Sequence, residues 1–212
     1  MLTIFMKEID GTWFGVAYAQ NKIVATCLES TRAGVKKNLI RSIPTHAEFN
    51  VVEKSSDFAE KSISMLKEIS QGNEELKSFT LATEYISEST AKVLKAAALV
   101  PIGFVTSYGN LAKVAATSPR VVGRIMAKNP IYPIVPCHRI VGSDFALVGY
   151  GGRKNTTALQ AKLDKLFKER RGFTSERKIS TDGGEFTVYP VEHVIRKVEK
   201  ELGFSHQQKR LV

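Results

Sequence analysis

The chain of 212 residues has few cysteines and no long apolar run. Its two cysteines, Cys27 and Cys137, stand far apart, which argues against a disulfide scaffold and fits a reducing compartment. No stretch is apolar enough to suggest a membrane span, and the N-terminus lacks the basic start and hydrophobic core of a signal peptide. We therefore expect the protein to stay in the compartment where it is made.

Acidic residues are scarce relative to basic ones. The chain has 31 Lys and Arg against 21 Asp and Glu, a net charge of +10. An excess of one sign attracts polyanions, so nucleic acid is the first partner to consider, although lysines on solvated helices would give the same total. Hydrophobic residues at 43% and charged residues at 25% are typical of a globular protein with an apolar core.

Residues 1–78 predict a small N-terminal α/β domain. Thr12–Ala19 and Lys22–Leu28 are rich in β-branched and aromatic residues, which favour strands. Apolar residues recur at helical spacing over Phe58–Ile69. The segment Gln71–Asn73 then marks the start of a linker.

Residues 79–172 predict a mostly helical, winged-helix-like domain. Apolar patterns indicate helices over Ser87–Leu99 and Asn110–Ala116. A third helix follows Ser118, which stands at the N-cap position, with Pro119 as the first helical residue. Helix, three-residue break and helix is the spacing of a helix-turn-helix, so the predicted fold class is α+β.

Residues 173–212 predict a C-terminal extension. A hairpin is expected over Lys178–Tyr189 with its turn at Asp182-Gly183-Gly184, followed by a short charged helix to about Leu202.

The third helix has two unlike sides. Arg120, Gly123, Arg124 and Ala127 follow the i, i+3, i+4, i+7 pattern and share one face. That face is basic and free of bulk, which suits a DNA groove. In the alternative interpretation, glycine and alanine only let another helix pack closely.

An apolar segment, Ile131–Val141, is interrupted by Pro136-Cys137-His138-Arg139. A buried polar triplet needs hydrogen-bond partners, and a neighbouring imidazole or cation can favour the reactive thiolate. An adjacent Cys-His pair is often incidental, because neighbouring strand residues point to opposite faces.

Four blocks resemble the O6-alkylguanine-DNA alkyltransferases. Pro136–Val141 resembles the family's active-site signature. Val100–Ala112 resembles the family's entry into the helix-turn-helix. Ser118–Gly123 resembles its recognition helix, and Lys128–Pro130 resembles the asparagine hinge after that helix. Gly149–Gly152 resembles its active-site loop. The blocks stand in the family's order with matching spacing, whereas the first stretch matches only in size, position and β-rich character.

The resemblance implies DNA repair by a protein that acts once and needs no cofactor. Cys137 would accept the alkyl group from O6 of a damaged guanine by in-line displacement, leaving a thioether that is not hydrolysed. His138 would activate the thiol through a bound water. The damaged nucleotide would first be rotated out of the duplex into a pocket.

The resemblance also implies that the recognition helix enters the minor groove of double-stranded DNA. Arg120 would fill the gap left by the rotated base, and Tyr108 would crowd the phosphate of that nucleotide. Gly123 and Ala127 would suit the narrow groove, beside Arg124 on the same face.

Three further residues belong to the implied site. Asn129 would join the recognition helix to the active site, although it could be only a helix C-cap before a proline. Tyr150 and Gly151 would line the base pocket, although a tyrosine among glycines could be a turn residue.

The sequence departs from the family pattern in two places. The family has a glutamate that orients the histidine, and counting from Tyr150 places Asp164 there, whereas a small insertion would make Glu169 the acid instead. Ile125 is bulkier than the family's usual alanine, and the helical winding turns it toward the core.

No metal site is expected, because Cys27 and His46 alone cannot form the four-ligand zinc site known in the human type of the family. We expect a monomer without membrane contact, in the cytoplasm near the nucleoid of a prokaryote or in the nucleus of a eukaryote.

Two other functions compete with alkyl transfer. A non-catalytic DNA-binding protein, either a regulator or an alkyltransferase-like lesion flagger, would use the same basic helix, but lesion flaggers lack the acceptor cysteine. A cysteine hydrolase using Cys137 and His138 would need an oxyanion hole and leaves the basic helix unexplained.

Overall fold

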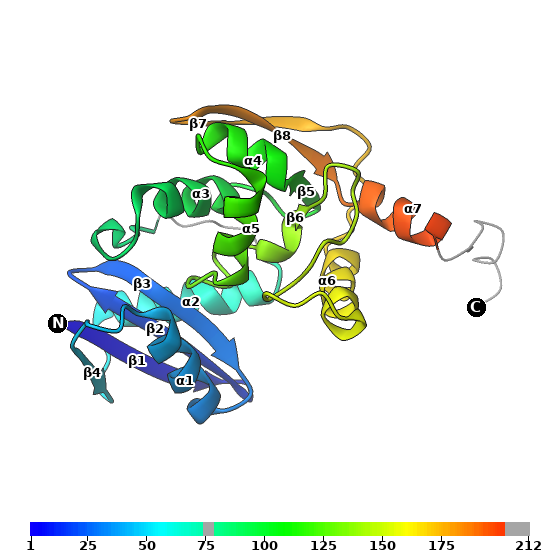
Figure 1. The fold of residues 1–212 in the computed structure, drawn as a ribbon. Helices are drawn as coiled ribbons and strands as arrows, with labels where there is room; N and C mark the ends of the chain where they lie inside the picture. The colour runs from blue at the N-terminus through cyan, green and yellow to red at the C-terminus, as the bar shows by residue number, and fades with distance from the viewer. Residues whose placement is uncertain (74–78, 202–212) are drawn as a thin grey trace. The chain divides into compact units, whose positions relative to one another are not determined.

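The computed structural model describes residues 1–73 and 79–201 (Figure 1). The chain divides into two compact units, one of Met1–Ala98 with Lys128–Cys137 and one of Leu99–Ala127 with His138–Val212. Each unit contains a four-stranded sheet and helices. The predicted α+β class is therefore confirmed.

The first unit has a sheet of strand order β3-β2-β1-β4. Its strands β1 (Leu2–Ile9), β2 (Thr12–Ala19) and β3 (Lys22–Glu29) form an antiparallel meander, and β4 (Phe49–Val52) pairs parallel to β1. The two strands predicted from β-branched and aromatic residues are confirmed, the second ending one residue later than expected.

Two helices cover the two faces of this sheet. In β2, Gly15 faces α1 (Arg32–Ser42), where a Cβ would collide with Val35. The opposite face of the sheet carries Tyr18, whose ring centroid lies 5.2 Å from that of Phe58 on α2 (Asp57–Ser70). Because alternate strand residues point to opposite faces, the sheet lies between the two helices. The unit continues with η1 and α3, which span Thr83–Tyr85 and Glu88–Ala98.

The outer edge of β3 holds the segment that leads to Cys137. The backbone N–H of Thr26 donates to the carbonyl of Pro130 at 2.8 Å, and its hydroxyl donates to the carbonyl of Tyr132 at 2.9 Å. Thr26 also forms a parallel bridge with Ile131. These bonds explain why 128–137 belongs to the same compact unit as the N-terminal sheet.

The second unit has a sheet of strand order β6-β5-β8-β7. β5 (Phe104–Ser107) pairs parallel to β6 (Ile140–Val141) and antiparallel to β8 (Gly184–Pro190), which forms a hairpin with β7 (Arg177–Thr181). The predicted hairpin is therefore confirmed.

The helix-turn-helix of this unit consists of α4 (Tyr108–Val114) and α5 (Pro119–Ala127). The hydroxyl of Ser107 caps α4, and that of Ser118 accepts from the N–H of Val121 at 3.4 Å at the start of α5. The start predicted from Ser118 and Pro119 is confirmed. Two more helices complete the unit, α6 (Thr156–Lys168) and α7 (Glu192–Glu201).

The C-terminal hairpin packs on the helix-turn-helix. The carbonyl of Thr187 in β8 accepts from Thr106 Oγ1 at 2.7 Å and from Asn110 Nδ2 at 3.1 Å. At the hairpin turn, Gly183 approaches Val114 so closely that a Cβ would overlap its carbonyl oxygen. The extension and the helix-turn-helix therefore share one compact unit.

The compact units thus differ from the three predicted domains, 1–78, 79–172 and 173–212, because β8 pairs with β5 and because 128–137 pairs with β3. The predicted boundary at residue 78 and the expected helix end at Leu202 lie outside the described residues. The three-domain division stays a prediction. Within 1–73 and 79–201, no helix is both long and apolar enough to cross a membrane.

Candidate active site

The reactive-looking triplet forms a turn. Cys137–Arg139 is the 3-10 helix η2, which leads directly into β6. The N–H of Cys137 donates to the carbonyl of Val135 at 2.9 Å, and the residue is 8% exposed. A turn, unlike a strand, does not send consecutive side chains to opposite faces.

Glu169 ends α6 and binds both residues that follow the cysteine. Its Oε1 lies 2.7 Å from Nε2 of His138, and its two oxygens accept from Nε and Nη2 of Arg139 at 2.9 and 3.0 Å. Arg139 also donates through Nη1 to the carbonyl of Val100 at 2.6 Å. The side chains of His138 and Arg139 are each 8% exposed and that of Glu169 is 12% exposed, so the array is buried and paired.

The charges of this array follow from its geometry. Burial alone raises the pKa of Glu169, but the hydrogen bonds and charges of His138 and Arg139 outweigh it and lower that pKa to about 2. Burial lowers the pKa of His138 and outweighs the opposing contact with Glu169. At neutral pH we therefore expect a carboxylate beside a neutral imidazole.

This charge state assigns the proton of the imidazole. A carboxylate only accepts hydrogen bonds, so Nε2 of His138 must donate to Glu169. In a neutral ring the other nitrogen, Nδ1, then carries a lone pair. Nδ1 is buried and makes no hydrogen bond within the described part of the chain. The histidine is therefore set up to accept a proton at Nδ1.

The acid beside the histidine is Glu169, and the assignment of Asp164 is wrong. Asp164 lies on the exposed side of α6, where its carboxylate accepts from Gln160 Nε2 at 2.7 Å, one helical turn earlier. The insertion that the sequence left open places the acid five residues later, at the C-cap of the helix.

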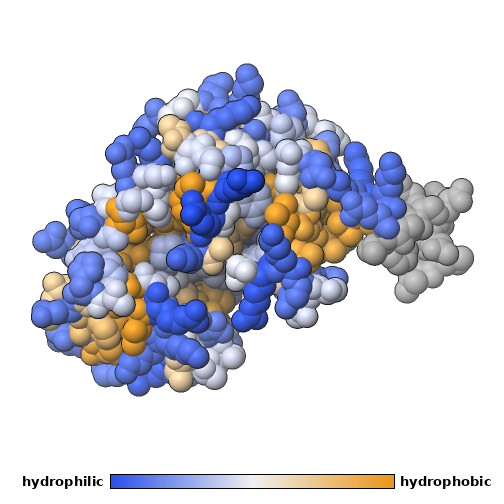
Figure 2. Space-filling view, in the orientation of Figure 1, coloured by the Kyte–Doolittle hydropathy of each residue, from blue (hydrophilic) through white to orange (hydrophobic). Residues whose placement is uncertain are grey.

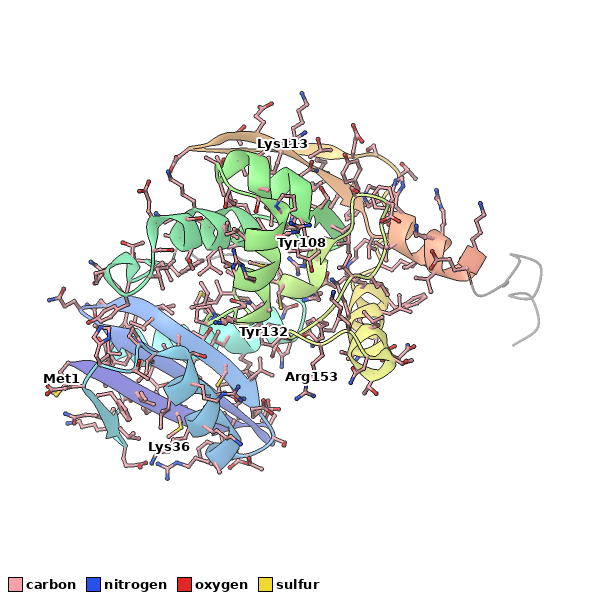
Figure 3. The ribbon with its side chains drawn as sticks, in the orientation of Figure 1. Met1, Lys36, Tyr108, Lys113, Tyr132 and Arg153 are labelled. Atoms are coloured by element: carbon pink, nitrogen blue, oxygen red, sulfur yellow. The ribbon has the colours of Figure 1, made fainter. Side chains whose placement is uncertain are left out.

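A buried lysine, which the sequence reasoning missed, joins three parts of this region. Lys162 on α6 is completely buried and donates through Nζ to the carbonyls of Ile140 and Gly149. The same Nζ lies 5.9 Å from the ring centroid of Tyr108, the first residue of α4, which Figure 3 labels. One helix thus connects the strand after the turn, the glycine loop and the helix-turn-helix.

The predicted pocket residues lie in a tight loop. Tyr150 and Arg153 exchange backbone hydrogen bonds of 2.9 and 3.0 Å, with Gly151 and Gly152 between them at positive φ. Tyr150 therefore flanks a tight turn and is half-buried, and its place in a base pocket stays a prediction. A Cβ on Gly152 would lie 3.6 Å from Ala127, which places the loop beside the end of α5.

The basic face of α5 is open. Arg120, Arg124 and Ala127 are exposed, whereas Val122 and Met126 are buried. A Cβ added at Gly123 would have no atom of the described chain within 4 Å. Gly123 therefore makes no close packing contact with another described helix.

Two smaller predictions concern residues near this helix. Asn129 does not cap α5: its Nδ2 donates to the carbonyl of Val135 at 2.8 Å and its Oδ1 accepts from the N–H of Ile131 at 3.1 Å, which closes the loop that precedes Cys137. Ile125 is half-buried, between the two sides of the helix. Among residues 1–73 and 79–201, no three His, Cys, Asp or Glu side chains gather as metal ligands would.

Known proteins resemble the middle part of the chain. Residues 88–170 match the family model described as the DNA binding domain of 6-O-methylguanine DNA methyltransferase. A methylated-DNA–protein-cysteine methyltransferase of Pyrobaculum aerophilum is 57% identical over 53 residues, which are 25% of this chain and 36% of the relative. The predicted resemblance to the O6-alkylguanine-DNA alkyltransferases is confirmed.

Other alkyltransferases extend the likeness. The relative from Mycolicibacterium paratuberculosis is 39% identical over 87 residues, 40% of this chain and 50% of the relative, so the chain spans half or less of the length of these two curated relatives. The O6-methylguanine-DNA methyltransferase of Pyrococcus kodakaraensis has a TM-score of 0.52 and 27% identity, covering 80% of this chain and 99% of that structure. The Mycobacterium tuberculosis protein in complex with DNA, at 20% identity, has a TM-score of 0.57, covers 79% of this chain and 92% of its own, and shows likeness of fold.

The alkyltransferase match ends at residue 170, so it includes Glu169 but none of β7, β8 or α7. Sequence reasoning named Cys137, His138 and the rival acid Glu169 but gave no role to Arg139 or Lys162. The signal for Arg139 was its place in a buried polar triplet, which had to find a counter-charge.

Proposed function

We propose that the protein repairs DNA by moving the alkyl group of O6-alkylguanine irreversibly to Sγ of Cys137. The observation that carries the proposal is the Glu169–His138 pair, which leaves Nδ1 of the histidine unprotonated one residue after the cysteine. The family match over 88–170 supports the same reaction.

In the proposed reaction, His138 Nδ1 takes the thiol proton through a bound water and Cys137 attacks the alkyl carbon in line with the bond to O6. The new S–C bond forms as the C–O6 bond breaks, and the electron pair stays on the guanine, which takes up a proton from the surrounding water. Glu169 stabilises the imidazolium formed during the step, and Arg139 holds Glu169 in place. The thioether product has no route back, so each molecule acts once and needs neither cofactor nor metal.

We propose that 79–172 is the part that binds DNA and carries out catalysis. The open face of α5, with Arg120, Gly123, Arg124 and Ala127, would enter the minor groove. Arg120 would fill the place of the rotated nucleotide and Tyr108 would crowd its phosphate. Affinity would depend little on sequence and would fall steeply with salt, because phosphate contacts release counterions.

The remaining predicted residues have supporting roles in this proposal. Tyr150 and Gly151 would line the pocket that receives the base, beside the end of α5. Asn129 would fix the loop before Cys137 through its bonds to Val135 and Ile131. The protein would work as a monomer in the compartment that holds the DNA.

Single-turnover transfer tests this function. A duplex containing one O6-methylguanine with a radiolabelled methyl group is mixed with excess protein, and protein-bound label is counted over time, with Cys137→Ala as the control. We expect wild-type label to saturate at one methyl per molecule and the control to stay unlabelled. Preferential binding at the lesion without transfer would replace the proposal by a lesion-flagging protein. Neither binding nor transfer would reject both.

A further inference from the structure

The loop that leads from β6 to Tyr150 is held by a part of the chain outside the alkyltransferase match. This loop, residues 142–149, contacts β8 and α7, and the match ends at residue 170. All of these elements belong to the second compact unit.

Aromatic packing fixes the middle of the loop. The ring of Phe145 lies 5.2 Å from that of Tyr189 at the end of β8 and 4.9 Å from that of His193 on α7, centroid to centroid. Phe145 has a φ of 64°, a left-handed conformation that a bulky side chain rarely adopts. Such a conformation persists only where the surroundings enforce it, and here the two rings do so.

A second tie lies one residue earlier. Lys197 on α7 donates to Oδ2 of Asp144 at 2.7 Å, while Oδ1 of the same carboxylate accepts from the N–H of Ala146 at 3.2 Å. Leu147 packs against a core cluster that includes Val194. Hydrophilic side chains (blue) cover the visible side of α7, and hydrophobic ones (orange) lie beside them (Figure 2).

The C-terminal end of the loop, at Gly149, is held by α6. The carbonyl of Gly149 accepts from buried Lys162, and Tyr150 follows directly. Release of Phe145 would therefore remove the aromatic contact that holds the middle of the loop, between the Lys197–Asp144 ion pair and the bond of Lys162 to Gly149. Tyr150 lies at the end of this loop, so its position depends on how the loop is held.

We infer that Tyr189, His193 and Lys197 are positioning residues, which hold loop 142–149 so that Tyr150 is placed for alkyl transfer. This inference rests on the proposed function. The C-terminal hairpin and helix would thus serve the transfer step, whereas the affinity for DNA would depend on the exposed basic side chains Arg120 and Arg124 of α5.

Amide hydrogen exchange tests directly whether α7 restrains loop 142–149, and this measurement does not depend on activity. The reporters are the N–H groups of Gly142 and Phe145, which donate to Ala146 and Gly142 within the loop. We expect His193→Ala to speed their exchange about tenfold by local opening, and His193→Phe to restore protection because the ring contact returns. Arg196→Ala, at an exposed site on the same helix, is the matched control and should change nothing. Unchanged exchange in His193→Ala would overturn the inference.

Kinetics then test the consequence for the reaction. At saturating DNA we expect His193→Ala to transfer methyl about tenfold more slowly, with its Kd for the duplex within twofold of wild type and with recovery in His193→Phe. A merely destabilised protein would instead lose active molecules, which a titration of the transfer endpoint counts, at an unchanged rate. If wild type itself transfers nothing, the proposed function fails while the exchange experiment still decides whether α7 holds the loop. A wild-type rate in His193→Ala would refute the positioning role.

Discussion

Oε1 of Glu169 lies 2.7 Å from Nε2 of His138, at the far side of the imidazole from its buried Nδ1. Because Glu169 is ionised and also bound to Arg139, it fixes both the orientation and the tautomer of the ring. The hydrogen-bonding pattern therefore determines which nitrogen can act as the base.

Replacing the carboxylate should affect activity and stability together. Glu169→Gln removes the counter-charge of buried Arg139 and weakens the bond to His138. We expect alkyl transfer to slow about 10- to 100-fold, and the free energy of unfolding to fall by about 3 kcal/mol. Asp164→Asn, on the exposed side of the same helix, is the matched control. Equal rates in the two variants would contradict the assignment of Glu169.

Acid should destabilise the protein in two stages. The pKa of His138 is lowered by burial and that of Glu169 is lowered to about 2 by its partners, so both groups bind protons more readily when unfolded. As the pH falls below about 6.5, the free energy of unfolding should decrease because His138 takes up a proton more readily in the unfolded chain. Below about pH 4.5 it should decrease again because of Glu169, by about 3 kcal/mol once this second stage is complete. Urea unfolding from pH 8 to 3 measures the first stage and the upper part of the second, which Glu169→Gln should lack. The same acid slope in both proteins would exclude Glu169 as its source.

The transfer rate should resist mild acid. A base with a lowered pKa stays neutral below the ordinary value of about 6.5 for histidine. We therefore expect the single-turnover rate to be level from pH 8 to about 6.5 and to fall only at lower pH. Measurement at saturating DNA separates this from weaker binding. A fall already complete at pH 7 would mean that His138 is protonated there.

Gly123 offers two substitutions, one that should raise stability and one that should weaken DNA binding. A Cβ there meets nothing within 4 Å, so Gly123→Ala fits and should stabilise α5 by up to about 1 kcal/mol through helix propensity. Gly123→Leu should keep the fold but weaken duplex binding at least tenfold if this face enters a groove. Thermal unfolding and fluorescence anisotropy measure the two effects. Undiminished affinity in Gly123→Leu would remove α5 from the DNA interface.

Local sequence signals predicted most elements, and non-local pairing escaped them. Thr12–Ala19 and the Ser118–Pro119 helix start were predicted because turn, cap and strand preferences are local. The pairing of β5 with β8 depends on residues far apart in the chain, which no local pattern records. Helix α1 escaped prediction because only Val35 and Leu39 of its residues are buried.

The choice between Asp164 and Glu169 as the acid beside His138 also depended on information that the local sequence does not give. Counting from Tyr150 favoured Asp164, because the length of the loop before α6 is not visible in the sequence. Helical spacing favours Glu169 instead, because Lys162, Leu166 and Glu169 stand at i, i+4 and i+7 on one inward face of α6. Asp164 stands two residues from Lys162, on the other side of the helix.

The most direct test of alkyl transfer to Cys137 is peptide mass spectrometry. The protein is incubated with a duplex containing one O6-methylguanine, digested with trypsin, and compared with protein given undamaged DNA. The proposal predicts one added methyl group on the peptide 129–139, which contains Cys137, and none on the peptide 23–32, which contains Cys27. A methyl group on 23–32, or on neither peptide, would contradict it.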